Sequence, residues 1–585
     1  MNLKPTYCLV VFSLLVVMTA IAKPSVHTPK NVIVKGPVTI TVSGIKNTSM
    51  LQNIERQIKA MSAAHLVKPI DKNAILTVYS NAPMGIKKAM QPYGYFRPTL
   101  KSTYSKQHDI WRMHFAITQG VHSKITRVTI KVIGQGAHTD DFSKSIKSYV
   151  SIEGHLFILS AYDDGNESLL KNAAQLGYFD AKIVVKHMNI NLLNNTVQIN
   201  IVFNTGDRHR FGRTEFSKTP FNQKFLQKYI AYRQGQYYNN TLADKTQNNF
   251  SSSDYFTHIS VAPDLKKSVG AITPMRVTLK MRKRSVYSFG LGYNTDTQIR
   301  GLAGFKYRWV NSWGHYFNAR MEGSFVDYNL GMAYHIPWPN PMKDLLSFRA
   351  GMGKLDLNRG KSKSYLLSVL YKHSYTHWDH TLSLNYLNER YNMTNLPRTR
   401  ANLIYPDLRI RYFSTKNRIN PDTGLSFIAD LSGTPAFLSS KSGYTRFSLT
   451  SKGVLSFLTN EQLVGRLSYG HIDINDINSL PLSLQFLIGG SQTVRGYSYQ
   501  SIGPGRNMLY GTVELRQRLW KQLYLGGFYD FGNVTDGHIF SNMSDSAGPS
   551  ILYRSPIGII ELSLPWRLAS RHSSPRVVFS MGPEL

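Results

Sequence analysis

The sequence predicts three small α+β domains followed by an all-β transmembrane barrel of sixteen antiparallel strands. First, a tripeptide rich in aromatic residues recurs in the first half of the chain at spacings of 83 and 77 residues. Second, segments of alternating hydrophobicity, separated by turn residues, follow from residue 285 onward. Third, no segment beyond the N-terminus reaches the roughly 20 consecutive apolar residues that a spanning helix requires.

The N-terminus has the pattern of a secretory signal peptide over residues 1–22. A basic start precedes the apolar stretch from Tyr7 to Ala20, and a small-x-small cleavage site ends at Ala22. The single cysteine of the chain, Cys8, lies within this segment. We therefore expect an exported protein whose mature chain forms no disulfide bond.

The composition favours a membrane barrel over a soluble β-rich protein, which is the alternative. The chain has 34 Tyr, 43 Gly and a mean hydropathy of −0.25, as expected when strands alternate lipid-facing and lumen-facing residues. The net charge of +35 would usually suggest a nucleic-acid partner. Export argues against nucleic acid, so we expect a positively charged lumen and contacts with anionic lipid headgroups.

Three repeats account for the region before the barrel. The repeated tripeptides are Gly94-Tyr95-Phe96, Gly177-Tyr178-Phe179 and Asp254-Tyr255-Phe256. Each follows a helix-like segment, namely 84–91, 167–176 and 243–251. Strand-like segments open and close each repeat, which gives the order β-α-α-β-β. This order resembles the POTRA domain, and it predicts POTRA domains at 23–122, 123–206 and 207–284.

Residues 285–585 should form the barrel. In the segment from Tyr287 to Asn294, large apolar side chains occupy one face and small or polar ones the other. If residues 285–585 are divided among sixteen strands, each strand with its connection has roughly 19 residues, which suits a transmembrane barrel. An even number of strands also returns the last strand to the first.

One arginine stands between turn-forming residues in this barrel region. Arg495 lies in the run from Gly489 to Tyr497, after the eleventh predicted strand. Its guanidinium offers a rigid fork of donors that suits a buried carboxylate. Alternation places Glu514 and Asp530 on the lumen side of two nearby strands. These acids are candidate partners of Arg495, and the alternative is that they are two of several unrelated lumen charges.

The whole chain resembles the family of bacterial outer-membrane assembly and two-partner secretion barrels, and most closely its TamA group. That group has a signal peptide, three POTRA domains and a sixteen-stranded barrel. Its sixth loop folds inward and carries a motif that is matched here by Val494, Arg495, Gly496 and Tyr497. Its carboxylates on the twelfth and thirteenth strands correspond to Glu514 and Asp530.

The C-terminal ending Gly582-Pro583-Glu584-Leu585 is also typical of the TamA group. Two positions depart from the group. Ser491 stands where an acidic residue is usual, and Glu561 stands where an aspartate is usual. These departures leave the contacts around the motif open.

The resemblance implies a lateral gate where the first strand of the barrel meets the last. The seam should comprise Tyr287, Phe289, Gly290, Leu291 and Gly292 opposite Val577, Val578, Phe579, Ser580 and Met581. The two glycines weaken strand packing, and lumen clearance or barrel curvature are the alternative reasons for them. An opened seam exposes a strand edge that can pair with an incoming strand.

The resemblance further implies an outer-membrane component of a translocation and assembly module in a Gram-negative bacterium, with its POTRA domains in the periplasm. Such a component inserts or secretes autotransporter-type and other β-barrel proteins. Its expected partners are a TamB-like inner-membrane-anchored protein, nascent outer-membrane proteins as substrates, and outer-membrane lipid, with no nucleic acid. The alternative is a two-partner secretion transporter that exports a large filamentous adhesin and has two POTRA domains.

No pattern in the sequence indicates an enzyme, a cofactor or a metal. The chain has no Gly-x-Ser-x-Gly motif, no paired cysteines and no His-Glu-x-x-His helix. His373, His377 and His380 form a tight cluster, which we assign to a periplasmic turn between the sixth and seventh strands. The basic run Lys280–Arg284 should reach toward phospholipid headgroups, with a solvated linker as the alternative.

Overall fold

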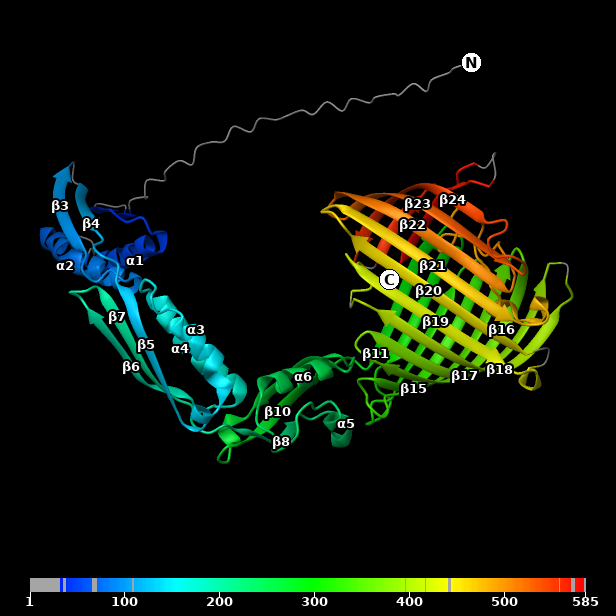
Figure 1. The fold of residues 1–585 in the computed structure, drawn as a ribbon, viewed down its shortest axis with the longest axis horizontal. Coiled ribbons are helices and arrows are strands. Elements are labelled where there is room, and N and C mark those ends of the chain that lie inside the picture. The colour runs from blue at the N-terminus through cyan, green and yellow to red at the C-terminus, as the bar shows by residue number, and fades with distance from the viewer. Residues whose placement is uncertain are drawn as a thin grey trace, which may run out of the picture. The chain divides into compact units, whose positions relative to one another are not determined.

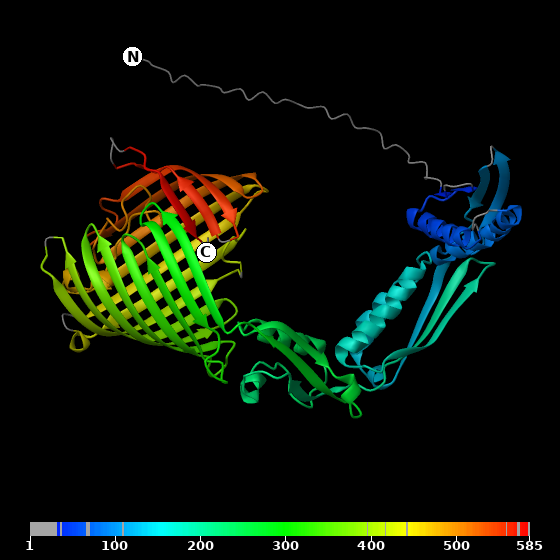
Figure 2. The same ribbon diagram turned by 180° about the vertical axis from the view of Figure 1, so that it is seen from behind.

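The computed structural model describes residues 32–34, 38–65, 71–107, 110–394, 396–415, 417–439, 443–556, 558–569 and 574–582. The predicted signal peptide and the last three residues lie outside these ranges. The chain divides into two compact units, of which one holds the first two α+β domains and the other holds most of the third domain together with the barrel (Figures 1 and 2). No helix in the described ranges is long and apolar enough to cross a membrane.

The first α+β domain packs two helices on one sheet. Its elements are β1 (Val32–Val34), β2 (Val38–Ser43), α1 (Thr48–His65), α2 (Lys72–Met90), β3 (Thr99–Gln107) and β4 (Ile110–Thr118). The sheet order is β1-β2-β4-β3, with β2 parallel to β4. Asp71 caps α2 by accepting a hydrogen bond from the backbone N of Ala74 at 2.6 Å. Ile40, Ile54 and Phe115 are fully buried between the layers.

The second domain repeats this arrangement. Its elements are β5 (Lys124–Ile133), α3 (Ser143–Val150), α4 (Leu159–Leu176), β6 (Lys182–Asn191) and β7 (Thr196–Asn204). The sheet order is β5-β7-β6, with β5 parallel to β7. The ring of Phe142 lies 5.2 Å from each of the rings of Tyr178 and Phe203, so the tyrosine of the repeated tripeptide belongs to the core.

The glycine of the tripeptide reverses the chain after a helix. Gly94 and Gly177 have φ angles of 79° and 92°, which side chains other than glycine rarely adopt. The third copy has Asp254 at this position, and Asp254 is not among the residues with positive φ. The glycine is therefore a helix-terminating residue in the first two copies, and the third copy uses the position differently.

The third domain has the same element order with a shorter first helix. Its elements are β8 (Arg210–Phe216), α5 (Gln223–Gln227), α6 (Asn240–Ser251), β9 (Phe256–Pro263) and β10 (Ile272–Met281), in the sheet order β8-β10-β9. The structure has a helix at each of the three segments predicted before the tripeptides, but each helix begins earlier in the chain than predicted. The predicted segments belong to α2, α4 and α6. In α2 the missed part ends at Pro83, which lies inside the helix, and in α4 it includes Gly165.

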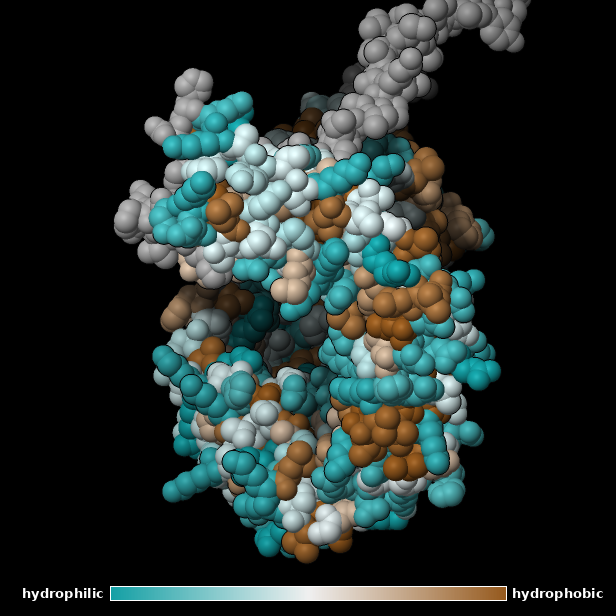
Figure 3. Space-filling view, turned by 90° about the vertical axis from the view of Figure 1, so that its left-hand side faces the viewer, coloured by the Kyte–Doolittle hydropathy of each residue, from teal (hydrophilic) through white to brown (hydrophobic). Residues whose placement is uncertain are grey.

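Each small sheet has open edges. In the first two domains β3 and β6 have a single ladder neighbour each, and most of their residues are exposed. Unpaired N–H and C=O groups on such strands can pair with an extended chain. On the face drawn in Figure 3, apolar side chains form separate patches among hydrophilic ones. The exposed residues of β3 and β6 leave these two edges accessible.

The described residues from 285 onward form an antiparallel barrel of sixteen strand positions, which confirms the predicted fold class. One position is interrupted, because β25 and β26 both pair with β24 and are separated by Leu564 and Pro565. The strands are β11 (Ser285–Asn294), β12 (Gln298–Tyr307), β13 (Tyr316–Gly323), β14 (Asp327–Ile336), β15 (Asp344–Leu357), β16 (Gly360–Ser374), β17 (Trp378–Met393), β18 (Thr399–Phe413), β19 (Gly424–Thr434), β20 (Tyr444–Ser456), β21 (Glu461–Asp473), β22 (Asn507–Trp520), β23 (Leu523–Thr535), β24 (Ser544–Ser555), β25 (Gly558–Ser563), β26 (Trp566–Arg567) and β27 (Val578–Gly582).

Alternation along the strands separates an apolar outer wall from a polar lumen. On β11 the side chains of Phe289 and Leu291 are 82% and 88% exposed, as expected for residues that face lipid. On β23 the neighbouring positions Tyr529 and Asp530 differ sharply, since Tyr529 is exposed and Asp530 is fully buried. The predicted lumen position of Asp530 follows from this alternation.

Candidate functional site

The loop that carries Arg495 connects β21 to β22, the eleventh and twelfth strands of the barrel, and spans residues 474–506. We call it the sixth loop. Ile488 and Val494 of this loop are fully buried in an apolar cluster. The barrel contributes inward-facing side chains from several strands to this cluster, including Leu387 of β17, Leu403 of β18 and Tyr444 of β20. The sixth loop therefore folds into the lumen.

The three glycines of the run around Arg495 shape this part of the loop, and two of them make close approaches. Gly489, Gly490 and Gly496 have φ angles of 113°, 101° and 88°. A Cβ atom on Gly489 would lie 2.4 Å from the carbonyl oxygen of Ser498, and one on Gly490 would lie 2.7 Å from Oδ2 of Asp296. These positions require glycine both for the backbone conformation and for space.

The Arg495 side chain is bound by the barrel wall. Its Nε and Nη2 donate to the two carboxylate oxygens of Asp530 at 2.7 and 2.8 Å, and its backbone N donates to Asp530 Oδ2 at 3.0 Å. The backbone oxygen of Arg495 accepts a hydrogen bond from Ser546 Oγ at 2.5 Å. The guanidinium carbon lies 3.4 Å from the centroid of the Phe528 ring. Arg495 is 3% exposed, so this bidentate pair is shielded from solvent.

Two further carboxylates contact the same guanidinium. Arg495 Nη1 lies 2.6 Å from Oε1 of Glu561 and 3.6 Å from Oε2 of Glu514. Glu514 also accepts hydrogen bonds from Ser550 Oγ at 2.8 Å and from Arg516 Nη2 at 3.3 Å. The structure thus brings the motif arginine together with both acids named from the sequence. It makes Asp530 the principal partner and places Glu514 farther away.

Glu561 is a partner that sequence reasoning did not assign. It appeared only as a departure from the family pattern, yet its carboxylate is closer to Arg495 than that of Glu514. The available signal was an acid in the apolar strand β25, close to the end of the chain. The contact of Glu561 with Arg495 could not be predicted from the sequence. The strand that carries Glu561, β25, is short and is interrupted at Pro565.

The buried cluster is a network of two arginines and three carboxylates. It contains Arg495 and Arg516 against Glu514, Asp530 and Glu561. A polar cavity of about 70 Å³ adjoins it and is lined by several of these side chains together with Ser580 of β27. Such a cluster is stable while complete and costly to break, because each removed partner leaves a charge buried without compensation.

The other motif residues also contact the wall. Arg567 Nε donates to the carbonyl oxygen of Gly496 at 2.8 Å, and its guanidinium carbon lies 4.9 Å from the centroid of the Tyr497 ring. A Cβ atom on Gly532 of β23 would lie 2.8 Å from Cγ2 of Val494. Every residue of the motif from Val494 to Tyr497 is therefore held by β23 or by the last part of the barrel.

Ser491 connects the sixth loop to the first hairpin of the barrel. Its backbone N donates to Asp296 Oδ2 at 2.6 Å, and its hydroxyl accepts from Asn294 Nδ2 at 3.3 Å. Asp296 and Asn294 lie at the turn between β11 and β12. The contact left open by the sequence departure at Ser491 is thus a contact with the start of the barrel.

The seam between β11 and β27 is sparsely bonded. The two strands stand at opposite ends of the ladder order, and no ladder joins their described residues. Thr295 and Phe579 make two hydrogen bonds, from Phe579 N to Thr295 Oγ1 at 2.8 Å and from Thr295 N to Phe579 O at 3.4 Å. The ring centroids of Tyr293 and Phe579 are 6.2 Å apart. By contrast, β11 pairs with β12 over its whole length.

The predicted seam residues are placed on these two strands. Tyr287, Gly290 and Gly292 belong to β11, as do Phe289 and Leu291. A Cβ atom on Gly292 would meet nothing within 4 Å, so close packing is not the reason for glycine there. Of the remaining predicted residues, Val577 directly precedes β27. The others lie on β27 and are Val578, Phe579, Ser580 and Met581. Their assignment to a gate stays a prediction.

The junction between the third domain and the barrel is an ionic contact. Asp254 Oδ2 lies 2.8 Å from Lys306 Nζ and 3.0 Å from Arg308 Nε, both on or just after β12. In the basic run, Arg282 Nε donates to Phe256 O at 2.7 Å and Arg284 Nε donates to Trp309 O at 2.8 Å. These two arginines bind the protein backbone, in contrast to the expected reach toward lipid.

The Asp254 contact should weaken in acid. Burial raises the pKa of Asp254, but the hydrogen bonds and charges of Lys306 and Arg308 outweigh it and lower the pKa below the usual 3.8. A lowered folded-state pKa stabilises the fold at higher pH, and the stabilisation is lost as pH falls through that pKa. We expect the urea midpoint to drop less between pH 6 and pH 3 in Asp254→Asn than in the unsubstituted protein. Equal drops would contradict this.

The histidine cluster lies where the sequence placed it. His373 is the second-last residue of β16 and contacts the carboxylate of Asp344, and His377 Nδ1 lies 2.9 Å from the carbonyl oxygen of Phe413. His380 is on β17 directly opposite His373. Within the part of the chain that the structure describes, no three His, Cys, Asp or Glu side chains are grouped as metal ligands would be.

Comparisons with known proteins show two family models that match parts of the chain and solved structures that are similar to it. Residues 314–584 match the Omp85 superfamily domain, and residues 39–119 match the first POTRA domain of TamA. The crystal structure of BamA from Haemophilus ducreyi lacking POTRA domains 1–3 is similar, with a TM-score of 0.65 and 15% identity over 78% of this chain and 98% of that one. CdiB from Acinetobacter baumannii gives a TM-score of 0.44 and 12% identity over 92% of this chain and 98% of that one.

Proposed function

Because the chain is a member of the Omp85 superfamily with a TamA-type first POTRA domain, we propose that it is the outer-membrane component of a translocation and assembly module. Its barrel lies in the outer membrane, and its POTRA domains lie in the periplasm. The proposed module inserts or secretes autotransporter-type and other β-barrel proteins. Its proposed partners are a TamB-like inner-membrane-anchored protein and nascent outer-membrane proteins.

The observation that supports a lateral gate is the small number of hydrogen bonds across the seam between β11 and β27. Only two backbone or side-chain hydrogen bonds join the described parts of the first hairpin and β27, both through Thr295 and Phe579. A weakly paired edge can separate at a low cost and then offer its free N–H and C=O groups to another strand. In lipid those groups must be paired, which favours β-augmentation by an incoming strand. The proposed substrate is therefore a chain that supplies a β-strand.

The sixth loop is proposed to keep the barrel in register while the seam opens. Arg495 is bound to β23 and β25, and Ser491 is bound to the β11–β12 turn. The loop thus contacts strands on both sides of the seam through the lumen. Separation of β11 from β27 leaves the buried pair of Arg495 and Asp530 intact, because neither residue belongs to the seam strands.

The periplasmic sheets are proposed to guide extended substrate and to dock the TamB-like partner through the first domain. The open edges β3 and β6 support this role, because an extended chain can add to them by β-augmentation. The alternative function, a two-partner secretion transporter, would have two such domains, whereas this chain has three α+β units. A pull-down from native membranes separates the two: a single large secreted adhesin would favour the alternative.

A disulfide across the seam tests the gate. Tyr293→Cys with Phe579→Cys joins the two strands where their rings are 6.2 Å apart, and the predicted mature chain has no other cysteine. We expect oxidation to abolish substrate insertion and reduction to restore it. The matched control is Tyr293→Cys with Ile299→Cys, which crosslinks the paired strands β11 and β12 and leaves the seam free. Full insertion by the oxidised seam variant would refute lateral opening.

A further inference from the structure

A row of cations crosses the outer wall of four neighbouring strands. Lys354 of β15 lies opposite Lys363 of β16, Lys363 lies opposite Arg390 of β17, and Arg390 lies opposite Arg400 of β18. Residues directly opposite in an antiparallel ladder share a face. All four side chains are exposed. We call these four residues the cationic row. They form a continuous positive band with one cation on each of the four strands.

The cationic row faces lipid and not the lumen. Lys354 is two residues from Met352, and Lys363 is two residues from Tyr365, both of which are exposed apolar residues of the outer wall. Alternate residues of a strand share a face, so the cations belong to the lipid-facing set. Like charges placed directly opposite each other are destabilising unless an anion lies between them.

Nearby acids do not neutralise the row. Among the described residues, the ion pairs place Asp356 on Lys361, one step closer to the strand ends. No ion pair joins Lys354, Lys363, Arg390 or Arg400 to a described carboxylate. The patch therefore has a strong net positive charge.

The row lies in the outer leaflet. The periplasmic domains end where β11 begins, so β11 runs outward and every second strand after it does the same. β15 is the fifth strand and runs from Asp344 at the periplasmic rim to Leu357 at the outer rim. Lys354 is therefore close to the outer rim, at the level of the outer-leaflet headgroups.

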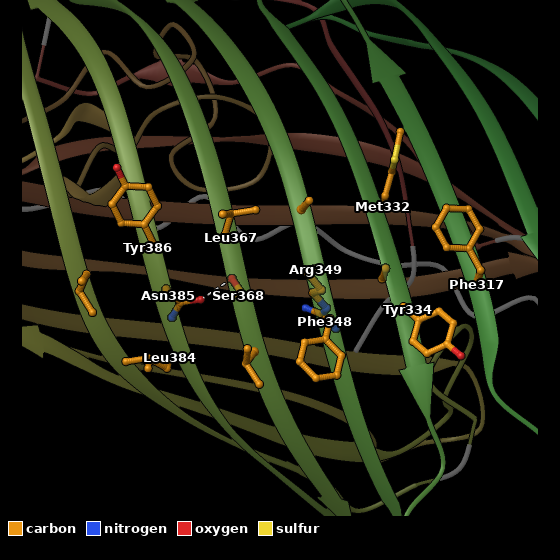
Figure 4. A pocket seen from close by; sticks show the side chains of 14 residues that line it. Phe317, Met332, Tyr334, Phe348, Arg349, Leu367, Ser368, Leu384, Asn385 and Tyr386 are labelled. Carbon is orange, nitrogen blue, oxygen red and sulfur yellow. Dashed lines mark hydrogen bonds between the residues drawn. The ribbon is translucent and has the colours of Figure 1, made fainter. Parts of the chain in front are cut away.

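An apolar hollow lies directly below the row, toward the membrane centre. Two adjoining depressions of about 580 and 340 Å³ share Met332, Ala350, Leu367 and Tyr386 as lining residues. Figure 4 shows Met332, Leu367 and Tyr386 around this space. Ala350 is small where its neighbours are large, which creates the hollow. It is four residues from Lys354, roughly 13 Å along the strand.

We propose that the cationic row and the hollow together bind a phosphate-bearing lipid of the outer leaflet, namely the lipid A part of lipopolysaccharide. The row contacts the phosphates, which suit the bidentate fork of the two arginines. The hollow receives an acyl chain, at the distance that separates headgroup from hydrocarbon. The inference rests on the orientation of the barrel and is independent of the gate.

Binding of defined lipids to the purified full-length protein tests this assignment. The row variant combines Lys354→Gln, Lys363→Gln, Arg390→Gln and Arg400→Gln, and native mass spectrometry measures its retention of lipid A. We expect at least a tenfold loss of lipid A affinity. A second variant, Ala350→Phe, fills the hollow and should weaken lipid A while leaving the cations in place. Heat-modifiable migration confirms that both variants are folded barrels.

A matched control removes the same charge elsewhere. Lys266, Lys283, Lys343 and Lys521 are exposed and lie on the periplasmic side, so their combined change to Gln should leave lipid A binding intact. Lipid A without its phosphates should bind the unsubstituted protein as weakly as intact lipid A binds the row variant. Undiminished lipid A binding by the row variant would overturn the proposal. An equal loss of phosphatidylglycerol binding would overturn the assignment to lipid A.

Discussion

Arg495→Ala should destabilise the barrel by about 3 to 5 kcal/mol, because breaking one partner of a buried pair leaves the other charge uncompensated. Asp530 is fully buried and accepts three hydrogen bonds from Arg495. Glu561 would lose its contact with Arg495 in the same substitution. Urea unfolding and heat-modifiable migration measure the loss of stability, and substrate insertion measures the loss of activity.

A partly exposed arginine of β18 provides the control for Arg495. Arg409 forms an ion pair with Asp430, but its side chain is 42% exposed, so Arg409→Ala should cost less than about 1 kcal/mol. Arg495→Lys keeps the charge but not the bidentate geometry and should fall between the two. Unchanged migration and unchanged insertion in Arg495→Ala would refute a role for this residue in holding the loop.

Gly532→Val should displace the sixth loop without touching a charge. A Cβ atom at this position would lie 2.7 Å from Cδ1 of Ile488 and 2.8 Å from Cγ2 of Val494, in a buried and well-packed region. Overpacking of this kind costs about 1 to 3 kcal/mol. We expect loop residues to become sensitive to protease and the barrel to unfold at a lower urea concentration.

The same strand offers a matched control for Gly532. A Cβ atom on Gly527 of β23 would meet nothing within 4 Å, and valine is favourable in a strand. Gly527→Val should therefore leave loop protection and stability unchanged. If both valine variants behave alike, the effect belongs to the strand and not to loop docking.

Much of the fold could be predicted from local patterns in the sequence. Alternation predicted the barrel and the lumen side of Glu514 and Asp530, since each strand residue faces opposite to its neighbour whatever the tertiary context. The repeated tripeptides located three α+β units because Tyr178 and Tyr255 are core residues with a fixed place in each unit. Helix starts were missed because Pro83 lies inside α2 and Gly165 lies inside α4, and both residue types usually interrupt a helix.

The contacts of the sixth loop were only partly predictable. The glycines around Arg495 indicated a tight turn, and the φ angles of Gly489 and Gly490 agree with this. The preference for Asp530 over Glu514 depends on ladder register and on the side-chain reach of Glu561. Spacing in the sequence does not determine which of several lumen acids lies nearest to a loop that crosses the barrel interior.

The sequence by itself determined the strand and helix pattern, the lumen set and the loop that carries the arginine, because these follow from the residue period and from glycine conformation. Only the tertiary structure decided that Ser491 binds the first hairpin, that Glu561 joins the arginine cluster, and that β11 and β27 share few hydrogen bonds. The physical reason is barrel closure. It brings residues almost 300 positions apart, such as Thr295 and Phe579, into contact, and no local pattern encodes the strength of that contact.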